Sequence, residues 1–323
     1  MASAACVGAV AIVLLGSDLD AEAVLRSVRA IDWWLVPVAA YHLVPLLLSA
    51  GAWQRALAPL QRRPLAALLA LRWIREGVSG LLPVAQIGGD AVGARLLAGP
   101  AVPASAAVAS VIVDLAIEAA TLGVFVVLGL ALLADTGSWT IALSGSTPAV
   151  AVALVAGVLV SATAWRLGLD RPLRRLAASL LRRWKEIGPA FARDIADAVA
   201  ARCADRRAMA AAVALHLLSW LAAAAEIWLV LLCIGVPIGV RAALVIESLS
   251  HALRGAAFFV PAGLGVQEAA LVELGGLFGI APEAALALAL ARRLREVALG
   301  VPALLAWQAL ELRRLSRSAA HRP

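Results

Sequence analysis

Charged side chains are scarce in this sequence, and their scarcity indicates the class of protein. Only 15% of the 323 residues are charged, whereas 63% are hydrophobic. A soluble protein has about 25% charged and about 45–50% apolar residues. Because long apolar runs alternate with short charged clusters, we predict an all-α integral membrane protein that forms a single transmembrane domain over residues 1–323.

Cysteine pairs and the motifs of soluble enzymes are also lacking. Cys6, Cys203 and Cys233 form no CxxC pair, so they indicate neither a disulfide framework nor a metal site. There is no HExxH, P-loop or GxSxG motif, and GLGVQE at 263–268 lacks the third glycine of a dinucleotide loop. We therefore expect no enzyme activity, no cofactor and no metal. The net charge of +7 lies mainly in loops, which favours a role in membrane orientation over nucleic-acid binding.

Six apolar runs predict membrane spans at about 3–16, 33–52, 104–134, 147–165, 208–234 and 283–310. The first run contains no Lys or Arg before Gly16, so we interpret it as a short span and not as a signal peptide. Two further apolar segments, 65–98 and 240–280, are interrupted by proline, glycine and charged residues.

Arginines in the connecting segments predict the orientation. The loop 166–207, the turn 53–64 and the short C-terminal tail 313–323 are rich in Lys and Arg, whereas 135–146 has neither. The positive-inside rule therefore places the first three segments in the cytoplasm, and both termini with them. The stretch RPLRRLAASLLRRW within the loop is either a solvated connector or a segment lying on the inner leaflet.

The cytoplasmic loop separates two halves, about 1–165 and 208–312. With six spans, the two interrupted segments must each return to the side they entered from, as re-entrant hairpins or as pairs of broken helices. A shift of 178 residues also pairs Gly77 with Gly255, Pro83 with Pro261, Asp90 with Glu268, Arg95 with Glu273, Asp114 with Arg292, and Glu118 with Glu296. Matching segments that enter from opposite sides indicate an inverted-topology repeat, which transporters use to build a site near the midplane.

The breaks in these segments predict irregular backbone at membrane depth, which is tolerated only inside protein or beside a polar cavity. The residues that we expect to form it are Pro83, Gly88, Gly89, Pro261, Gly263 and Gly265. Asp90 follows the first glycine pair, where it either caps the next helix or faces a ligand headgroup.

Further charges fall inside apolar segments, where each costs at least about 2.5–3.5 kcal/mol at mid-depth. Paired across a central cavity they become tolerable; the alternative is a set of ion pairs that only fixes helix register. The candidate substrate-path residues are Arg75, Asp90, Arg95, Asp114, Glu118, Glu247, His251, Arg254, Gln267, Glu268, Arg292, Arg295 and Glu296. Glu226 and His216 lie in the fifth span, and we interpret His216 as a hydrogen-bonded core residue.

The stretch GGDAVGARLL after Pro83 and the later PAGLGVQEAAL from Pro261 resemble the membrane domain of the lysylphosphatidylglycerol synthase family, in its hopanoid-biosynthesis-associated branch. The resemblance implies a multi-span lipid flippase with re-entrant helices, in which Asp90 and Glu268 are motif positions. Gly93 and Gln267 stand near places where the broader family has arginine, which reduces the attraction for an anionic headgroup. The chain ends soon after the last predicted span, so we expect no aminoacyl-transferase domain.

Three hypotheses follow. The leading one is an inner-membrane flippase or transporter that moves hopanoids toward the outer leaflet or outer membrane. The second keeps the translocator but makes the cargo a phospholipid or polyprenyl-linked glycolipid, with the arginines binding phosphate. The third is a membrane enzyme that uses a carboxylate as acid or base. The expected partners are the lipid and the bilayer; a homo-oligomer and a proton-coupled cycle through Glu247 and His251 stay open.

Overall fold

The computed structural model describes residues 32–57, 63–82, 88–135, 188–256 and 265–320, and these residues are almost entirely helical. The helices are α3 (Leu35–Tyr41), α4 (Leu43–Ala56), α5 (Leu65–Leu81), α6 (Gly88–Leu97), α7 (Ala104–Ala134), α11 (Pro189–Ala204), α12 (Arg206–Cys233), α13 (Val240–Ala256), α14 (Val266–Gly276) and α15 (Pro282–Ala320). A 3-10 turn, η1 (Asp32–Trp34), precedes α3. Within these ranges the only β structure is an isolated bridge between Gly99 and Val102. The predicted all-α class is confirmed for the described residues.

Three helices are long and apolar enough to cross a membrane by length and composition: Val36–Ala56, Ala104–Ala134 and Arg206–Cys233. They correspond to the spans predicted at 33–52, 104–134 and 208–234. The span predicted at 283–310 falls inside α15, a helix of 39 residues whose middle carries several charges. The spans predicted at 3–16 and 147–165 lie outside the described residues.

Local signals explain where several helices begin and end. The Asp205 side chain accepts the backbone N–H of Ala208 at 3.0 Å, which caps the start of α12. Gly235, with a φ of 77°, takes the left-handed conformation just after α12 ends, and Gly265, with a φ of 81°, does the same just before α14. Only glycine adopts this conformation without strain.

The helices of the two halves follow the same order with nearly the same bounds. A shift of 178 residues carries the start of α6 at Gly88 onto the start of α14 at Val266, and the start of α7 at Ala104 onto the start of α15 at Pro282. Helices α5 and α13 have 17 residues each. Each half therefore contains a span (α4 or α12), a long arm (α5 or α13), a short arm (α6 or α14) and a second long helix (α7 or α15). This order agrees with the spacing of the sequence pairs.

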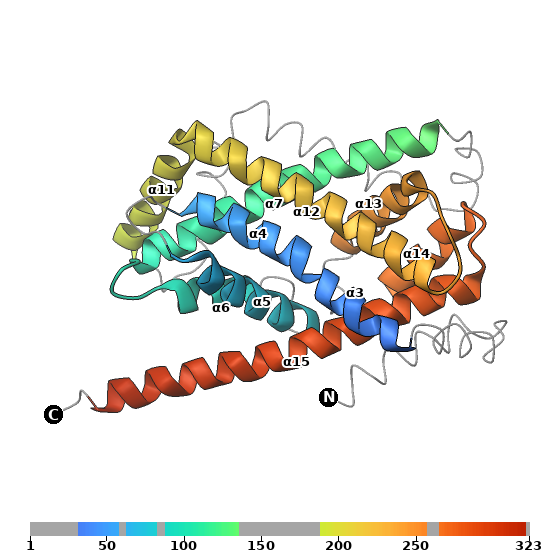
Figure 1. Ribbon diagram of the computed structural model, residues 1–323. Helices are drawn as coiled ribbons and strands as arrows, with labels where there is room; N and C mark the ends of the chain where they lie inside the picture. The colour runs from blue at the N-terminus through green and yellow to red at the C-terminus, as the bar shows by residue number, and fades with distance from the viewer. Residues whose placement is uncertain (1–31, 58–62, 83–87, 136–187, 257–264, 321–323) are drawn as a thin grey trace.

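The two halves run in opposite directions. His42 of α4 contacts Glu226 of α12, and Ser49 contacts Ser219, so contacts advance along α4 as they retreat along α12. Figure 1 shows α4 and α12 side by side, with the arms α5 and α6 toward one end of the bundle and α13 and α14 toward the other. Each long arm packs on the other half's long helix, α5 on α15 and α13 on α7.

Two hydrophobic cores occupy the opposite ends of the bundle. The first contains Trp53 and Leu68 and takes the residues of α7 up to Ile117. The second contains Leu231 and Leu271 and takes α7 from Val126 onward. Helix α12 is divided in the same way, with Ala212 in the first core and Ile227 in the second, whereas α4 contributes only to the first. The buried residues in the middle of α7 and α12 belong to neither core, so the space for a polar site lies midway along the spans.

Two of the basic segments are partly helical. Part of the loop 166–207 is the helix α11, whose buried Ile195 and Val199 pack in the first core. The stretch RPLRRLAASLLRRW, for which two alternatives were left open, lies outside the described residues. The described part of the tail 313–323 continues α15 through Ala320.

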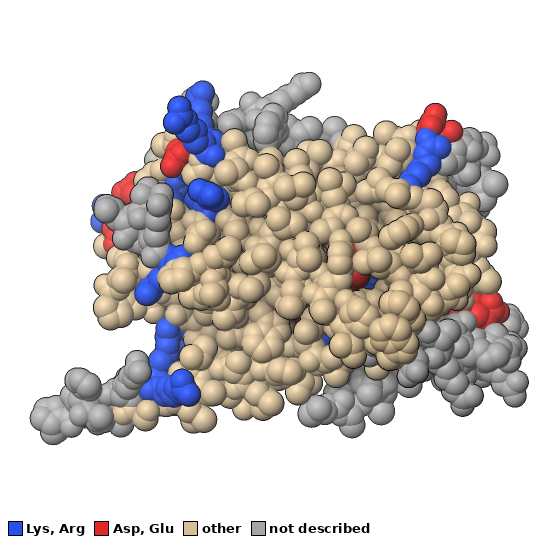
Figure 2. Space-filling model, viewed as in Figure 1, with Lys and Arg blue, Asp and Glu red and all other residues tan. Residues whose placement is uncertain are grey.

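Basic side chains gather at one end of the molecule. Figure 1 shows the end of α4, helix α11, the start of α12 and the end of α15 on the same side, and Figure 2 shows blue side chains there beside a broad neutral surface. The described arginines that are exposed in these segments are Arg55, Arg193, Arg206, Arg207 and Arg313. The described parts of the basic segments that were predicted to share one side of the membrane therefore lie together.

Candidate functional site

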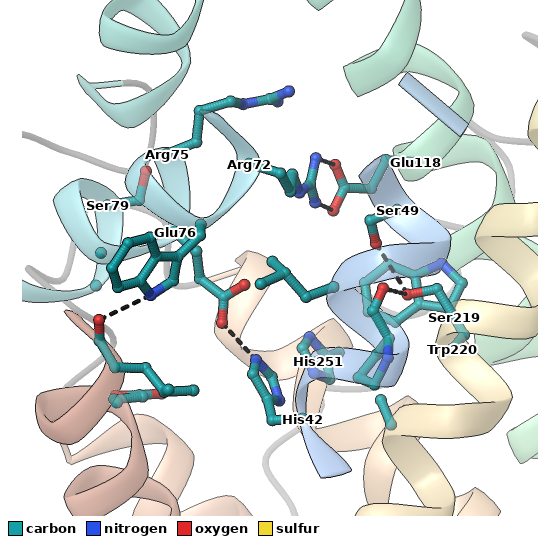
Figure 3. Close-up of a pocket in the computed structure, with 18 of the residues that line it drawn as sticks. His42, Ser49, Arg72, Arg75, Glu76, Ser79, Glu118, Ser219, Trp220 and His251 are labelled. Carbon is teal, nitrogen blue, oxygen red and sulfur yellow. Dashed lines mark hydrogen bonds and ion pairs between the residues drawn. The ribbon is translucent and has the colours of Figure 1, made fainter. Parts of the chain in front are cut away.

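A cavity of about 460 Å³ lies between the two halves, at the level of the gap between the cores. It is lined by α4, α5, α6, α7, α12, α13 and α15, and its walls are unusually polar for the centre of an apolar bundle (Figure 3). The charged residues that line it are Arg72, Arg75, Arg254, Arg292, Arg295, Glu76, Asp90, Glu118, Glu226, Glu247 and Glu296, with His42, His216 and His251. Six carboxylates thus face five guanidiniums, so the wall carries a slight excess of acid before any histidine is charged.

Arg75 ties the first hairpin to the long helix α7. Its Nη2 donates to Asp90 Oδ1 of α6 at 2.6 Å, and its Nη1 donates to Asp114 Oδ2 of α7 at 2.9 Å. The guanidinium also lies over the Trp53 ring, 4.6 Å from the ring centroid. Because Arg75 is 3% exposed and Asp114 is 1% exposed, this is a buried ion pair whose partners depend on each other.

Asp114 is the centre of a wider network. Its Oδ1 lies 3.1 Å from His216 Nε2, and its Oδ2 also accepts from Arg72 at 3.1 Å. Arg72 grips Glu118 with both Nη atoms, at 2.6 Å and 3.1 Å. Three cationic or hydrogen-bonding partners therefore converge on one fully buried carboxylate. His216 is a hydrogen-bonded core residue, as interpreted, although it also lines the cavity.

The second half holds its own network. Arg292 of α15 and Glu247 of α13 form a bidentate pair with N–O distances of 2.7 Å and 2.9 Å, and His251 lies 3.0 Å from the same carboxylate. Arg293 joins Glu268 of α14 to Glu296, each at 2.7 Å. The hairpin of α13 and α14 is thus attached to α15 by charge.

A third group joins the halves. His42, at the junction of α3 and α4, lies 2.7 Å from Glu76 of α5 through Nε2 and 2.8 Å from Glu226 of α12 through Nδ1. Arg295 of α15 contacts Glu226 and also lies 2.8 Å from His42 Nδ1. Four helices from both halves therefore meet at one imidazole.

Glycines allow the first hairpin to close around Arg75. A methyl group at Gly89 would lie 2.1 Å from the Arg75 carbonyl oxygen, and one at Gly93 would lie 2.5 Å from the Arg75 side chain. A real Cβ cannot approach so closely, so only glycine lets α6 lie against α5 at these two points. Gly88 and Gly89, which we predicted to form irregular backbone, are instead the first two residues of α6, and Gly89 allows the close contact within the hairpin.

The two long arms differ in how closely their inner ends pack. A methyl at Gly77 would lie 2.7 Å from the Ala303 Cβ and 3.2 Å from the backbone of Gly300, so α5 is pressed against α15. The equivalent position, Gly255 on α13, has no described atom within 4 Å of such a methyl. Both glycines line the cavity, so the two arms differ in how closely they pack at this position and not in whether they reach the cavity.

Most of the predicted path residues meet at this site. Those that line the cavity are Arg75, Asp90, Glu118, Glu247, His251, Arg254, Arg292, Arg295 and Glu296. Asp114 lies directly behind the wall. Gln267 is 3.3 Å from Arg254, and Glu268 is bound to Arg293, so both support the wall without lining it.

Arg95 is the exception. Its side chain is 68% exposed at the end of α6 and pairs with Glu311 of α15, where the hydrogen bond lowers the pKa of Glu311. It is therefore a surface residue and not part of the cavity wall. Pro83, Pro261 and Gly263 lie outside the described residues.

The two predicted roles of the motif carboxylates are divided between the halves. Asp90 binds Arg75 in the wall. Glu268 instead accepts the Gly265 N–H at 2.8 Å and so caps the start of α14. The capping role that we considered for Asp90 thus falls to its counterpart.

Sequence reasoning missed His42, Arg72 and Glu76 and left Glu226 out of the path. Arg72 and Glu76 are four residues apart in an apolar helix, and this spacing could have placed them on one face with Arg75. His42 gave no such signal, because its partners are 34, 184 and 253 residues away in the sequence.

The described residues contain no cluster of three or more His, Cys, Asp or Glu side chains arranged to hold a metal ion. Compared with known proteins, residues 1–303 match the family model described as the lysylphosphatidylglycerol synthase TM region. No curated protein and no solved structure gives a significant match.

Proposed function

The chain belongs to the lysylphosphatidylglycerol synthase TM family, and on that premise we propose that it is a flippase for the polar headgroup of a membrane lipid. The observation that carries the proposal is the charged cavity midway along the spans, between two hairpins that approach from opposite ends of the bundle. Charges at this depth are costly and mark polar pathways. A headgroup that crosses the bilayer needs such a pathway, while its tails remain in lipid.

The same proposal gives the topology. Hairpins α5–α6 and α13–α14 enter the bilayer from opposite sides as the two copies of an inverted repeat, with six full spans around them. The basic end of the bundle faces the cytoplasm of a bacterium with the protein in its inner membrane. The unequal packing of Gly77 and Gly255 supports a cycle in which the arms exchange their open and closed positions.

For the cargo, we propose a neutral hydroxylated lipid of the hopanoid class. Every cavity arginine already faces a carboxylate or an amide oxygen, and acids outnumber guanidiniums in the wall. Hydroxyls donate to carboxylates and also accept from guanidinium N–H groups. Among the described residues, Arg292 Nε and Arg295 Nε lack an acceptor. A phosphate would meet the excess carboxylates at close range, which disfavours it.

The second candidate cargo is a phospholipid or polyprenyl-linked glycolipid, which is favoured by the five arginines of the wall. A lipid-modifying enzyme is disfavoured, because no nucleophile stands beside a base among the cavity residues named above. The three alternatives predict different behaviour of the purified protein: movement of a hopanoid, movement of a phosphate-bearing lipid, or chemical conversion of a lipid.

The experiment is reconstitution of the full chain in liposomes that contain fluorescent analogues of a polyhydroxylated triterpenoid or of phosphatidylglycerol. Accessibility of the label to a membrane-impermeant quencher measures its movement between leaflets. We expect protein-dependent movement of the triterpenoid, reduced at least about tenfold by Asp90→Asn or Glu247→Gln, whose charges line the cavity. Glu273→Gln, at an exposed position on α14, is the matched control.

Movement of phosphatidylglycerol alone would replace the hopanoid by the second cargo. Unchanged movement in both cavity variants would refute the site. Chemical conversion of either lipid would favour an enzyme. In cells, deletion of the gene followed by separate lipid analysis of inner and outer membranes provides an independent check: under the proposal hopanoids are still made but fail to reach the outer membrane.

A further inference from the structure

The His42 imidazole is held between two carboxylates deep in the protein. Nε2 lies 2.7 Å from Glu76 Oε1, and Nδ1 lies 2.8 Å from Glu226 Oε2. Figure 3 shows His42 and Glu76 pointing toward one another across the cavity. The side chain of Glu226 is 5% exposed, whereas that of Glu76 is 45% exposed and faces the cavity. One side of the imidazole is thus sealed and the other communicates with the cavity.

The number of protons in this group is not fixed by its geometry. A neutral imidazole carries one N–H, so it can donate to Glu76 or to Glu226 but not to both. Donation to both carboxylates at the observed distances requires one further proton, which makes the ring an imidazolium. Without that proton, one nitrogen lone pair faces a carboxylate oxygen at hydrogen-bond distance, which is repulsive.

Arg295 offers His42 Nδ1 a second hydrogen-bond partner, so the protonation state of this nitrogen determines which partner it binds. Its Nη1 lies 2.8 Å from His42 Nδ1, the same nitrogen that faces Glu226. A guanidinium only donates. When Nδ1 is unprotonated, it therefore accepts from Arg295; when Nδ1 carries a proton, it donates to Glu226 and is repelled by Arg295. Each protonation state favours one of two contacts that are equally close in this structure.

These contacts connect the moving parts of the proposed cycle. His42, at the junction of α3 and α4, and Glu76 of α5 belong to the first half, whereas Glu226 of α12 and Arg295 of α15 belong to the second. At Gly77, the residue directly after Glu76, α5 is pressed against α15. A change of hydrogen-bond partner at His42 Nδ1 therefore acts where α5 of the first half packs against α15 of the second.

We propose that His42, with Glu76, Glu226 and Arg295, forms a proton-binding site that couples proton uptake from the cavity to the movement of the α5 arm relative to α15. The proposal rests on the flippase function above and gives it an energy source, namely the proton gradient. It differs from a cycle through Glu247 and His251, because that pair is tied to Arg292 within the second half and spans no seam between the halves.

The charged groups around the site agree with a titratable centre. Arg72 on α5 acts on Glu76, and Arg292 on α15 acts on Glu226. Tyr41, beside His42, also interacts electrostatically with Glu226. Arg72 and Arg292 are each paired with another carboxylate. The groups in direct contact with His42 are two carboxylates and one guanidinium, a net charge of −1, so one proton on His42 neutralises the group.

The first test measures proton binding directly. Histidine labelled with ¹⁵N in the full chain, purified in lipid nanodiscs, reports the protonation of each ring nitrogen by NMR. We expect the His42 signal, assigned by its loss in His42→Gln, to change from one N–H to two as the pH falls from about 9 to about 5. Glu226→Gln should remove the doubly protonated form, because the neutral amide no longer stabilises it. A His42 ring unchanged over this range would overturn the proposal whether or not lipid moves.

The second test measures coupling in the liposome assay, with a pH difference imposed in either direction. We expect the initial rate to change about tenfold per pH unit on the limiting side of a one-proton titration, and to lose this dependence in His42→Gln and Glu226→Gln. His321→Gln, a histidine of the C-terminal tail, is the matched control and should keep the wild-type profile.

The outcomes separate the two proposals. Lipid movement that is the same at every pH, with a wild-type profile in His42→Gln, overturns the coupling and leaves the flippase intact. No lipid movement at any pH, with normal titration of His42 by NMR, removes the flippase and the coupling together but keeps the proton site. Because Glu226→Gln preserves shape, its purification as a folded protein distinguishes lost coupling from lost folding.

Discussion

The two halves carry buried charges of opposite sign at the equivalent position of the long helix, and each pairs with its arm at a position of its own, since the shift of 178 residues carries Arg75 onto Leu253 and not onto Glu247. In the first half the acid is on the long helix, Asp114 on α7, and its arginine partner Arg75 is on the arm. In the second half Arg292, at the position equivalent to Asp114, is on the long helix, and Glu247 is on the arm. A buried ion pair holds two helices together whichever side carries the acid. What the repeat preserves is therefore complementarity between elements and not the residue type.

The halves also differ in how their arms pack. Gly77 is pressed against α15, whereas its equivalent Gly255 has no described atom near the position of a Cβ, although both glycines line the cavity. Under the proposed function, this unequal packing is one of two states that the repeat exchanges to give access from alternate sides.

The largest expected effect comes from breaking one buried pair in each half. Glu247→Gln leaves the buried Arg292 without its counterion, at a cost of about 3–5 kcal/mol in the free energy of unfolding. We expect Asp114→Asn to cost less, because Arg75 keeps Asp90 and Arg72 keeps Glu118 as carboxylate partners. Denaturant unfolding of the purified protein in detergent measures both.

The double variant Glu247→Leu/Arg292→Met completes this test. Replacing both charges by apolar groups should recover much of the loss seen in Glu247→Gln, because no buried charge is left unpaired. If the double variant lost as much free energy of unfolding as the two single changes together, the ion pair itself would stabilise the second half, and an unpaired buried charge would not explain the loss seen in Glu247→Gln.

The next effect compares the two equivalent glycines. Gly77→Ala places a methyl 2.7 Å from Ala303 and should destabilise the protein by about 1–3 kcal/mol. Gly255→Ala meets open space and should leave stability unchanged or raise it by up to about 1 kcal/mol, the helix propensity of alanine. Thermal unfolding of both variants measures the contrast.

The rate of lipid movement in Gly255→Ala tests whether α13 must pack closely during transport. If the arms exchange positions, Gly255→Ala slows transport although the protein is not destabilised, because α13 must then pack as α5 packs now. Wild-type transport in Gly255→Ala would indicate that α13 never closes on α7 and that the asymmetry is permanent.

A smaller effect separates the two motif carboxylates. Glu268→Ala removes the acceptor for the Gly265 N–H and should cost about 0.5–2 kcal/mol, as the loss of a helix cap does. Asp90→Ala leaves Arg75 with Asp114 as its remaining partner, so we expect lost transport with the folded protein retained. Circular dichroism and the liposome assay, applied to both variants, separate capping from transport; equal loss of folding in the two would contradict the division of roles.

The smallest effect concerns the surface pair of Arg95 and Glu311, which has no counterpart at the exposed Glu273. Arg95→Ala should cost at most about 1 kcal/mol, less at high salt. The hydrogen bond from Arg95 lowers the pKa of Glu311, so its stabilisation is present above the ordinary glutamate pKa of about 4.3 and is lost as the pH falls through the lowered value. Unfolding midpoints of wild type and Arg95→Ala should therefore converge in acid.

Local signals in the sequence predicted more than the helices themselves. The shift of 178 residues aligned helix starts that the structure places at Gly88 and Val266, and the charges within apolar runs identified most of the cavity wall. Arg95 was misplaced, because its closeness to the GGD motif in sequence says nothing about which face of α6 it occupies. His42 was missed, since its three partners come from three distant helices.

Composition and periodicity by themselves determined that the chain is helical, embedded in a membrane, and built from two matching halves, because hydrocarbon leaves few other arrangements for so apolar a chain. The pairing of the charges, the unequal packing of the arms and the contacts around His42 were decided only by tertiary structure. Each depends on side chains from both halves approaching to within a hydrogen bond, and that distance is set by how α4, α5, α12 and α15 pack.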